Sequence, residues 1–473
     1  MYQSFIGLEI HIHLLTKTKA FCGCTSEFGA PPNTHICPVC LGYPGVLPAA
    51  NEEAMRMSYM VAKILHCTLS PKCYFDRKNY FYPDMTKNYQ ISQFHDPVGR
   101  DGYFDIEVEG EHKRVRIHDV HLEEDAGKMI HSGKTSLCDY NRAGTSLLEI
   151  VTEPDLVTGK DAEAFIREFR RMVRHLGVCD GNMEEGSLRC DANVSINLQG
   201  QGLGTKTEVK NLNSARFVRK ALEYEIKRQK RVLTKGEKVI QETRLWDGDN
   251  NVTAGMRTKE KAHDYRYFPE PDMPPFCPDD AFMAAVDERM VELPLAKKQR
   301  YLNDLKLSLD AAEFLVEDSK FCDLFEAALA LESSEPKLVA NWLCGDVQGQ
   351  LKRADVSLEE SHISAGRLNE LVGLVESGKL LRGKAKEVIE LIINDDKDPA
   401  VIVKEQGFEQ VLDESQIDDW VKQAIDGNPQ AVEQIQAGNK KTLSFLVGQV
   451  MRFSKGKADP KKATEKLEQA LGL

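Results

Sequence analysis

The stretch FIGLEIHIHL, residues 5–14, decides how the first half of this chain folds. Its aliphatic residues alternate with Glu9, His11 and His13, and a β-strand turns successive side chains to opposite faces. The pattern predicts a strand with one aliphatic face for a core and one polar face. A single polar face of this kind usually lies in water, so a functional site requires matching polar strands elsewhere in the chain.

Three later stretches provide such polar faces. They are HLEEDAGK (residues 121–128), SLRCDANVSI (187–196) and GTKTEVKNLN (204–213), and the last two alternate polar and apolar residues as a strand does. Their polar positions are Glu123, Glu124, Asp125, Arg189, Asp191, Asn193, Ser195, Lys206, Glu208 and Lys210. Solvated sheet faces remain the alternative interpretation, but four mixed acidic and basic faces favour a common site.

This mixture of side chains suits a nucleotide and a metal ion. Mg²⁺ takes oxygen ligands from a few carboxylates together with substrate phosphates, and phosphoryl transfer needs positive charge around the transferred group. The chain has no Gly-x-x-x-x-Gly-Lys-Ser/Thr stretch, so bound ATP would not lie on a P-loop. We therefore expect ATP and Mg²⁺ on the sheet itself.

Four cysteines form a second candidate centre. Cys22 and Cys24 in CGC, and Cys37 and Cys40 in CPVC, have the paired spacing of a tetrahedral zinc site on two loops. Four unrelated core cysteines are the alternative. A site closed by four thiolates has no open position, so we expect structural Zn²⁺. The other eight cysteines show no ligand spacing and are expected to be buried.

The order of strand and helix patterns predicts an α+β protein. Alternating patterns and turns dominate up to about residue 290, including a hairpin in residues 103–120 that turns at Gly110-Glu111. Within this region helices are expected in residues 51–66, capped by Asn51, and in residues 160–177, ending at Gly177. After Pro294 the patterns are helical. We divide the chain at 1–293, 294–404 and 405–473.

The overall composition is that of a globular protein without a membrane span. The charged fraction is 29%, and no apolar run approaches the roughly 20 residues that cross a bilayer. Since the first residues lack a signal-peptide pattern, we expect a cytoplasmic protein. The net charge of −12 argues against general polyanion binding, yet residues 439–463 are strongly basic and predict local phosphate contacts.

The motifs together resemble one family, the GatB subunits of the heterotrimeric GatCAB aminoacyl-tRNA amidotransferases. The most specific stretch is DYNRAGTSLLEIVTEPD, residues 139–155. Further motifs that resemble the family are GLEIHIHL, FDRKNYFYPD, HLEEDAGK, GSLRCDANVSI, GTKTEVKNLNS, AHDYRYFPEPD and FLVGQVM. Two positions depart from the usual pattern: His13 stands where the family has Gln, and Ser146 where it has Pro.

The resemblance implies a fold and a reaction. The fold would be a β-rich, glutamine-synthetase-like cradle, then a helical domain and a small YqeY-like tail that binds tRNA. The enzyme would be an ATP-dependent carbon–nitrogen ligase that phosphorylates the side-chain carboxylate of mischarged Glu-tRNA(Gln) or Asp-tRNA(Asn). Ammonia would come through a channel from the glutaminase partner GatA, with GatC as third subunit. An assembly with a non-discriminating synthetase, and the choice between the two tRNAs, stay open.

The resemblance also implies roles for individual residues. Those matching the family's catalytic and magnesium positions are Glu9, His11, Glu124 and Glu208, with Asp191 and Lys206 as further catalytic candidates. Expected nucleotide or substrate contacts are Glu123, Arg189, Asn193, Ser195 and Lys210. His13 is given no catalytic role. Two other functions remain to be distinguished, a non-catalytic tRNA scaffold and a free-standing ligase for a small carboxylate. The basic tail argues against the ligase.

Overall fold

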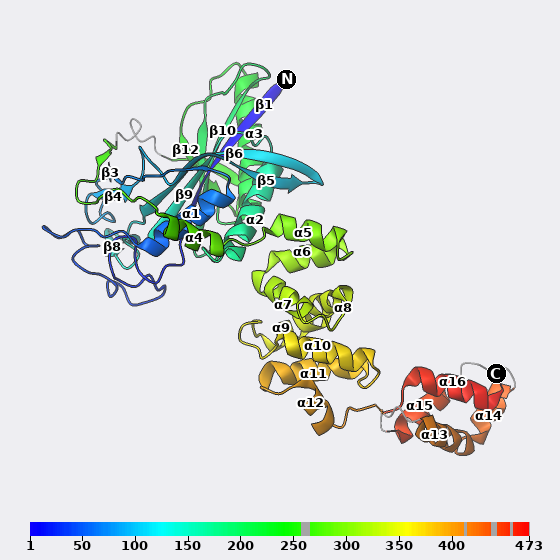
Figure 1. Cartoon of the computed structure of the whole chain (residues 1–473). Helices are drawn as coiled ribbons and strands as arrows, with labels where there is room; N and C mark the ends of the chain where they lie inside the picture. The colour runs from blue at the N-terminus through cyan, green and yellow to red at the C-terminus, as the bar shows by residue number, and fades with distance from the viewer. Residues whose placement is uncertain (257–264, 411–413, 437–441, 455–456, 473) are drawn as a thin grey trace. The chain divides into compact units, whose positions relative to one another are not determined.

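The computed structural model of the chain describes residues 1–256, 265–410, 414–436, 442–454 and 457–472. The chain divides into two compact units, Met1–Leu295 and Ala296–Leu473 (Figure 1). Within the described residues, the strands lie in the first unit, and the second is helical apart from one isolated bridge. The α+β class expected from the sequence is therefore confirmed.

A nine-stranded sheet forms the centre of the first unit. Its strand order is β13-β12-β11-β10-β1-β9-β6-β5-β2, so strands distant in sequence lie side by side. Its strands are β1 (Tyr2–His13), β2 (Thr68–Leu69), β5 (Gly99–Val108), β6 (Glu111–Glu124), β9 (Ser146–Thr152), β10 (Leu188–Leu198), β11 (Thr207–Lys210), β12 (Thr243–Asp247) and β13 (Val252–Gly255). β1 occupies the middle of this order and pairs antiparallel with both β10 and β9.

The alternation in β1 is the one that the sequence predicts. The aliphatic residues Ile6, Leu8, Ile10 and Ile12 each have an exposed fraction of at most 1%, and all belong to the main hydrophobic cluster. The intervening polar residues on the opposite face are half-buried. Since burying an aliphatic side chain stabilises a fold by about 1.5–3 kcal/mol, these four residues fix which face of β1 is inward.

Helices that pack on the sheet complete this core. They are α1 (Glu52–Ile64), α2 (Gly159–His175), α3 (Ala215–Thr234) and α4 (Asp280–Glu288). α1 packs against β5 and β6, α2 against β5, and α3 against β10, while α4 contacts α1. Asn51 caps α1 and the chain leaves α2 at Gly177 with φ +68°, as predicted.

The hairpin expected in residues 103–120 is present with its turn one residue earlier than predicted. β5 pairs with β6 and the turn residues are Glu109 and Gly110, which have φ +53° and +86°. Two positive φ values give the right-handed twist that a two-residue hairpin requires, and Glu111 already belongs to β6.

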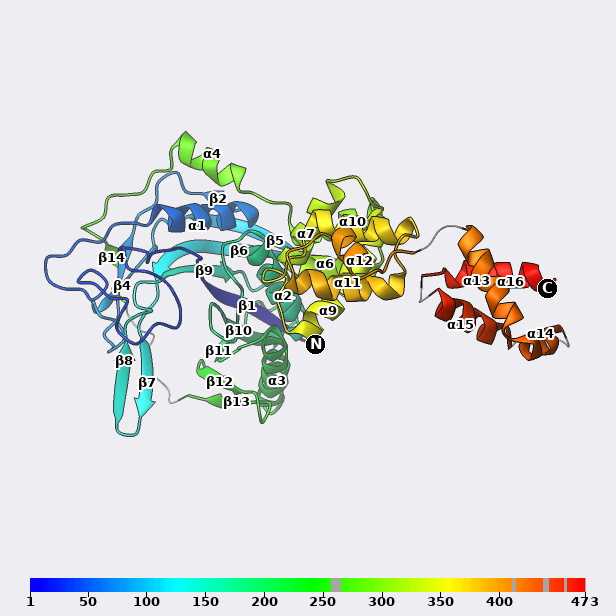
Figure 2. The same cartoon turned by 90° about the horizontal axis from the view of Figure 1, so that it is seen from below.

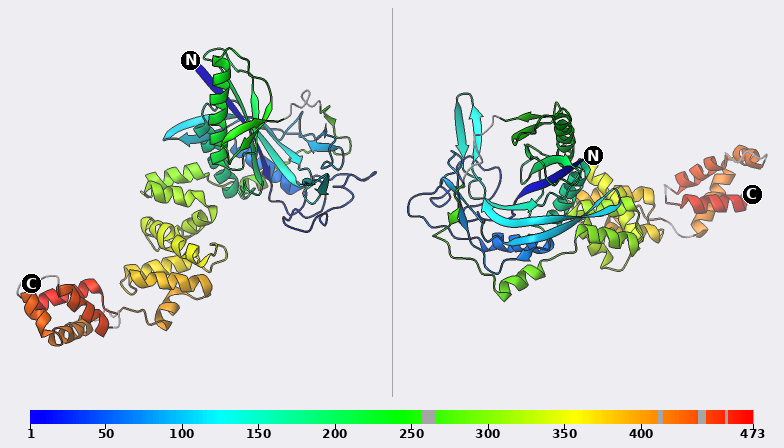
Figure 3. Two further views of the ribbon diagram at one scale, coloured as in Figure 1. Left: turned by 180° about the vertical axis from the view of Figure 1, so that it is seen from behind. Right: turned by 90° about the horizontal axis from the view of Figure 1, so that it is seen from above.

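Two small sheets accompany the large one. β14 (Phe268–Pro269), β3 (Asp76–Asn79) and β4 (Tyr89–Ser92) form a three-stranded sheet in that order. β7 (Lys128–Ser132) and β8 (Thr135–Asp139) form a separate hairpin that projects from the first unit (Figures 2 and 3).

The described part of the second unit contains two hydrophobic clusters. The first spans residues 301–403 and the second spans 417–467. Helices around the first cluster are α5 (Pro294–Asn303), α6 (Leu309–Glu317), α7 (Ser319–Leu329), α8 (Pro336–Asn341), the π-helical turn η1 (Trp342–Val347), α9 (Gln348–Ala354), α10 (Ala365–Glu376), α11 (Arg382–Asn394) and α12 (Pro399–Glu405). Those around the second are α13 (Glu414–Asp426), α14 (Pro429–Gln436), α15 (Leu443–Phe453) and α16 (Pro460–Leu471).

The three-domain division stays a prediction. Phe408 still packs against the first cluster of the second unit and the second cluster begins at Ile417, so the two separate a little after residue 405, where the sequence suggested a boundary. The first unit ends at Leu295, beside the expected boundary at residue 293. Several basic residues of the predicted tail, Lys440, Lys441 and Lys455, lie outside the described residues.

Candidate active site and zinc centre

Three neighbouring strands place a polar row across the sheet. The pairing of β1 with β9 sets His11 opposite Glu149, and the pairing of β9 with β6 sets Glu149 opposite His121. Residues paired across antiparallel strands point to the same face, so these three side chains lie side by side. His11 Nε2 and His121 Nε2 are each 3.2 Å from Glu149 Oε2.

Two further carboxylates complete this row. Asp119 Oδ1 lies 2.8 Å from His121 Nδ1 and so fixes the orientation of that imidazole. Glu123 is buried, with carboxylate oxygens 3.9 Å from His11 Nε2 and 4.0 Å from His121 Nε2. A basic group offsets the acidic charge, since Lys78 Nζ lies 3.9 Å from Glu123 Oε2.

The row shifts the pKa values of its members in opposite directions. Burial alone would lower the pKa of His11, but the Glu149 carboxylate outweighs it and raises the pKa. The pKa of His121 is raised well above its usual value in the same way. Burial would raise the pKa of Glu149, but the two imidazoles hold it well below its usual value. Glu149 is therefore an anion at neutral pH.

The donor atoms of this row fit a divalent cation. One ligand atom from each of His11, Glu123 and Glu149 can be chosen so that all lie within 4.8 Å of one another. Carboxylate oxygens are the ligands that Mg²⁺ prefers, and a hard cation could keep waters or substrate phosphates in its remaining positions. Asp119 and His121 would then hold the Glu149 ligand in place.

A second group of acidic residues lies on the neighbouring strands. The pairing of β1 with β10 sets Glu9 opposite Asp191. The pairing of β10 with β11 sets Asn193 opposite Glu208. Asn193 Nδ2 donates to Glu9 Oε1 at 2.8 Å. Lys210 Nζ lies 2.5 Å from Asp191 Oδ2 and 2.9 Å from Glu208 Oε1, so one ammonium neutralises two carboxylates.

The two acidic groups influence each other. Burial raises the pKa of Glu9, and the nearby Glu149 and Glu208 carboxylates add to that shift. Glu208 behaves differently. Burial opposes the change, but a hydrogen bond from Thr243 and the charge of Lys210 lower its pKa. Glu9 is therefore close to the carboxylates of both the polar row and the second acidic group. A cation bound there would reduce the repulsion between these carboxylates.

Glu124 and Asp125 have other partners. Glu124 ion-pairs with Lys87 and accepts a hydrogen bond from the Ile91 backbone N–H at 2.9 Å. Asp125 Oδ2 lies 2.6 Å from His13 Nε2 and 2.5 Å from Arg189. Their charges lower the pKa of Asp125 despite its burial.

The two remaining predicted site residues differ in exposure. Ser195 is buried on β10 opposite Phe5. Lys206 is exposed and directly precedes β11, where its charge contributes to lowering the pKa of Glu208.

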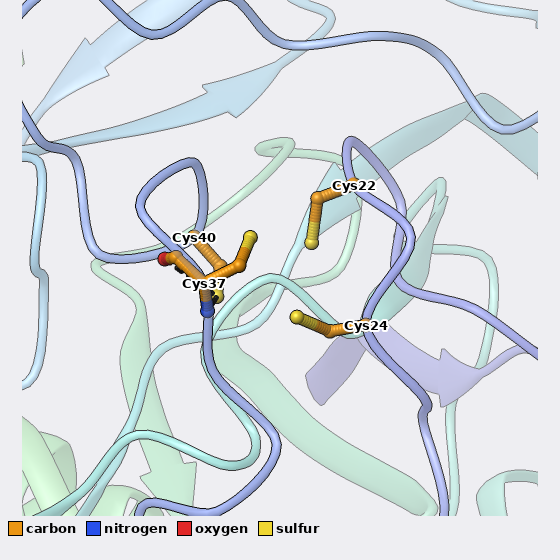
Figure 4. Close-up of side chains that lie close together, drawn as sticks. All are labelled: Cys22, Cys24, Cys37 and Cys40. Carbon is orange, nitrogen blue, oxygen red and sulfur yellow. Dashed lines mark hydrogen bonds between the residues drawn. The ribbon is translucent and has the colours of Figure 1, made fainter.

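The four predicted zinc ligands do come together. Cys22, Cys24, Cys37 and Cys40 offer sulfur atoms that all lie within 4.8 Å of one another, and Figure 4 shows their sulfurs converging from two loops. The Cys37 backbone N–H donates to Cys40 Sγ at 3.2 Å. A set of four cysteine sulfurs is one that structural Zn²⁺ uses in proteins.

Contacts between the sulfurs shift their pKa values. A hydrogen bond from the Cys22 thiol lowers the pKa of Cys40, and the same contact raises the pKa of Cys22. Buried Lys19 also places its ammonium 3.7 Å from Cys40 Sγ and donates to the His35 carbonyl at 2.8 Å. A positive charge beside a cluster of thiolates reduces their mutual repulsion.

The expectation that the other eight cysteines are buried is only partly correct. Cys67, Cys73, Cys179, Cys190 and Cys322 are buried. Cys138 and Cys344 are half-buried, and Cys277 is exposed.

Across the described residues, no helix is long and apolar enough to cross a membrane.

Comparisons with known proteins identify the family. Residues 4–284 match the model of the GatB/GatE catalytic domain, and residues 323–471 match the GatB domain model named GatB_Yqey. The chain belongs to the GatB/GatE family. This result confirms the resemblance seen in the sequence motifs.

Relatives in this family match along nearly their whole length. All three described here are the B subunits of aspartyl/glutamyl-tRNA(Asn/Gln) amidotransferases. The protein of Persephonella marina is 45% identical over 471 residues, covering 99% of both chains. That of Thermodesulfovibrio yellowstonii is 46% identical over 466 residues, covering 98% of both. That of Brevibacillus brevis is 46% identical over 473 residues, covering 99% of both.

In this GatB/GatE family member, the sequence did not predict three residues of the central row, Glu149, His121 and Asp119. Glu149 lies within the family-like stretch SLLEIVT, where every residue except Val151 is buried, and this stretch resembles an ordinary core strand. A charged residue inside such an apolar run was the available signal. His121 was included only as the first residue of the motif HLEEDAGK. Glu149 and His121 belong to the row because of strand pairings that the sequence alone does not reveal.

Proposed function

We propose that this chain is the B subunit of an aspartyl/glutamyl-tRNA(Asn/Gln) amidotransferase, which converts misacylated tRNA to Gln-tRNA or Asn-tRNA. Within that enzyme it would use ATP to phosphorylate the side-chain carboxylate of the misacylated residue. The observation that carries this proposal is the buried row in which Glu149 lies between His11 and His121, with Glu123 beside it. Such a concentration of buried acidic and imidazole groups is typical of a site for metal-dependent chemistry.

The chemistry explains why a phosphorylating site is needed. A carboxylate resists attack by ammonia because neither oxygen is a good leaving group. Transfer of the γ-phosphoryl group from ATP forms an acyl phosphate and ADP, and ammonia then displaces phosphate to leave the amide. When bound, Mg²⁺ would neutralise phosphate charge during the first transfer.

The residues of the row have distinct tasks in this proposal. His11, Glu123 and Glu149 would hold the magnesium ion, and Asp119 and His121 position the Glu149 carboxylate. Glu9, Glu208 and Asp191 belong to the adjoining acidic group, which would complete the nucleotide and metal site. Lys210 neutralises two of these carboxylates, and we propose that its ammonium contacts a phosphate oxygen when the nucleotide binds.

Several assignments stay proposals for this site. Arg189, Asn193, Ser195 and Lys206 are proposed contacts for nucleotide or substrate. Glu124 is a proposed magnesium ligand from the family resemblance, although its carboxylate is engaged by Lys87 and the Ile91 N–H. We also propose that the four-cysteine centre binds structural Zn²⁺.

Partner proteins would supply the remaining functions. The relatives are named as B subunits, which indicates an enzyme of several chains. We propose that GatA hydrolyses glutamine and delivers ammonia, that GatC is the third subunit, and that the complex works in the cytoplasm. The tail, residues 405–473, is the proposed tRNA-binding part.

Amidation of each misacylated tRNA tests this function directly. The complex would be supplied with Glu-tRNA(Gln) or Asp-tRNA(Asn), with and without ATP, and with glutamine or ammonium chloride. We expect ADP to form only when aminoacyl-tRNA and Mg²⁺ are both present. Amidation that proceeds without ATP would contradict the phosphorylation step and favour the tRNA scaffold instead.

A further inference from the structure

The three-stranded sheet β14-β3-β4 lies directly beside the candidate active site. Its residues Lys78 and Ser92 reach Glu123, with Lys78 Nζ 3.9 Å and Ser92 Oγ 3.4 Å from Glu123 Oε2. The family assignment gives no role to this sheet.

The loop after β3, the loop after β4 and the segment just before β14 carry aromatic rings. We call Phe81, Phe94, Tyr265 and Tyr267 the aromatic row. The Phe94 and Tyr267 rings stack with centroids 4.3 Å apart and planes at 13°, and Tyr267 contacts Tyr265 edge-on at 6.1 Å. The guanidinium of Arg266 lies 5.9 Å from the Phe81 ring centroid. Arg266, which lies between Tyr265 and Tyr267 in the chain, thus links Phe81 to the other three rings.

Both ends of the aromatic row are open to solvent. Phe94 is 55% exposed and Phe81 is 67% exposed, which is unusual for large apolar rings. Tyr267 is partly buried, which raises its pKa to about 12, with the Lys78 charge opposing that shift and the Glu123 and Glu149 carboxylates adding to it. The centre of the row therefore borders the acidic site while its ends face outward.

Buried groups hold the row in a fixed place. The buried Asp76 carboxylate accepts hydrogen bonds from the Phe94 and His95 N–H groups at 2.8 and 3.0 Å. Asn79 donates from its backbone N–H to the Tyr265 carbonyl at 3.0 Å and from its side chain to the Arg266 carbonyl at 2.8 Å. A surface fixed before binding loses little conformational entropy when a ligand arrives.

Positive charges also lie over aromatic rings in and beside this row. Lys78 Nζ lies 5.2 Å from the Tyr265 ring centroid, and Arg77 lies over Tyr89 at 4.2 Å. Proteins that bind single-stranded nucleic acid combine basic groups for the phosphates with aromatic rings on which successive bases stack. The row matches that combination.

We propose that the aromatic row binds the unpaired 3′-terminal nucleotides of the substrate tRNA. This inference rests on the proposed function, in which the aminoacyl group must reach the row of His11 and Glu149. The aminoacyl ester is attached to the terminal nucleotide, so the last bases must lie close to that site. A single adenine of ATP would need one stacking position, whereas the row extends past the site and offers exposed rings at both ends.

Binding of intact and shortened tRNA tests this proposal. We would measure the Kd of the full-length chain, without ATP, for uncharged tRNA(Gln) and for the same tRNA lacking its last three nucleotides. The variants are Phe94→Ala and Phe81→Ala, with Phe94→Trp to keep an aromatic ring. Phe28→Ala serves as the control, because Phe28 is 80% exposed and lies in the loop of the cysteine centre.

We expect each alanine variant to weaken binding of intact tRNA by roughly tenfold, and Phe94→Trp and Phe28→Ala to leave it unchanged. Binding of the shortened tRNA should not respond to any variant. Two results would overturn the proposal: equal losses for both tRNAs, or no loss for either. These binding assays contain no ATP, so they do not test the phosphorylation step. Failure of that step would be seen in a different measurement, as the absence of ADP formation.

Discussion

His11 on β1 and Glu149 on β9 lie directly opposite each other in the nine-stranded sheet, with His11 Nε2 3.2 Å from Glu149 Oε2. His121 approaches the same oxygen from β6 at the same distance. One carboxylate therefore holds two imidazoles, and its negative charge raises the pKa of both. Neutralising Glu149 should consequently disturb more of the site than neutralising any carboxylate with a single partner.

Replacing Glu149 with Gln removes this charge while keeping the side-chain volume. We expect ATP-dependent phosphorylation of the aminoacyl-tRNA to fall by roughly 100-fold or more, because a proposed metal ligand and the partner of two histidines are lost together. Glu153→Gln is the matched control, since Glu153 lies 3.0 Å from a single exposed histidine, His118. ADP formation measures the effect, and comparable losses in both variants would argue against the role of Glu149.

The importance of Glu149 shows what the sequence could and could not predict. Alternation in residues 5–14 was sufficient to identify the polar face of β1, because one strand fixes its own faces. The neighbours of that face depend on long-range pairing, which places β9 between β1 and β6. Cys22 and Cys37, in contrast, belong to short motifs whose spacing already implies a common centre. Helix caps such as Asn51 are likewise local, and the structure agrees with them.

Glu123 and Glu124 illustrate the same limit at one strand end. Adjacent strand residues point to opposite faces, so only one of them can share the face of His121. The structure groups Glu123 with His11 and Glu149, whereas the family resemblance suggested Glu124. We expect Glu123→Gln to lower the affinity for Mg²⁺ or Mn²⁺ by roughly 10- to 100-fold, with a smaller effect for Glu124→Gln. Metal titration of both variants decides the matter, and the reverse order would support Glu124 as the ligand.

Cys37→Ser should release zinc and lower the thermal stability of the first unit. Removing one of four thiolates opens the tetrahedral site, and metal binding to such a site contributes directly to folding. Cys277→Ser is the control, because Cys277 is exposed and lies outside the cluster. Elemental analysis and the thermal midpoint measure the two effects. A Cys37→Ser protein that keeps one zinc per chain and an unchanged midpoint would refute the structural role.

Glu225 offers a stability test away from the site. It is fully buried on α3, where its carboxylate binds Arg228 through two oxygens and lies 3.5 Å from Arg244. Burial opposes ionisation, but the hydrogen bonds from Arg228 and Gln229 outweigh it and lower the pKa of Glu225. Breaking a buried pair from one side leaves an unpaired charge, so Glu225→Gln should cost about 3–5 kcal/mol.

The lowered pKa of Glu225 also sets the direction of a pH effect. A carboxyl whose folded pKa lies below its unfolded value stabilises the fold at neutral pH, and that contribution is lost as the pH falls below about 4.3 towards the folded pKa. Urea unfolding of wild type and Glu225→Gln should therefore differ most near pH 7 and converge under acid conditions. A difference that stays constant from pH 7 to pH 3 would contradict this assignment.

The C-terminal tail carries basic residues that can be tested for a contribution to tRNA affinity. Its described helices have their own hydrophobic cluster, and α16 begins with the basic residues Lys461 and Lys462 after Pro460. If this part contacts tRNA phosphates, Lys461→Gln and Lys462→Gln together should weaken tRNA binding. The slope of the logarithm of the binding constant against the logarithm of the salt concentration should also become less steep, by up to about two units. Glu465→Gln, on the same helix, is the charge-changing control. Kd values measured from 50 to 200 mM salt decide between the possibilities. An unchanged slope in the lysine variant would show that these residues do not contact phosphates, whatever the affinity at one salt concentration.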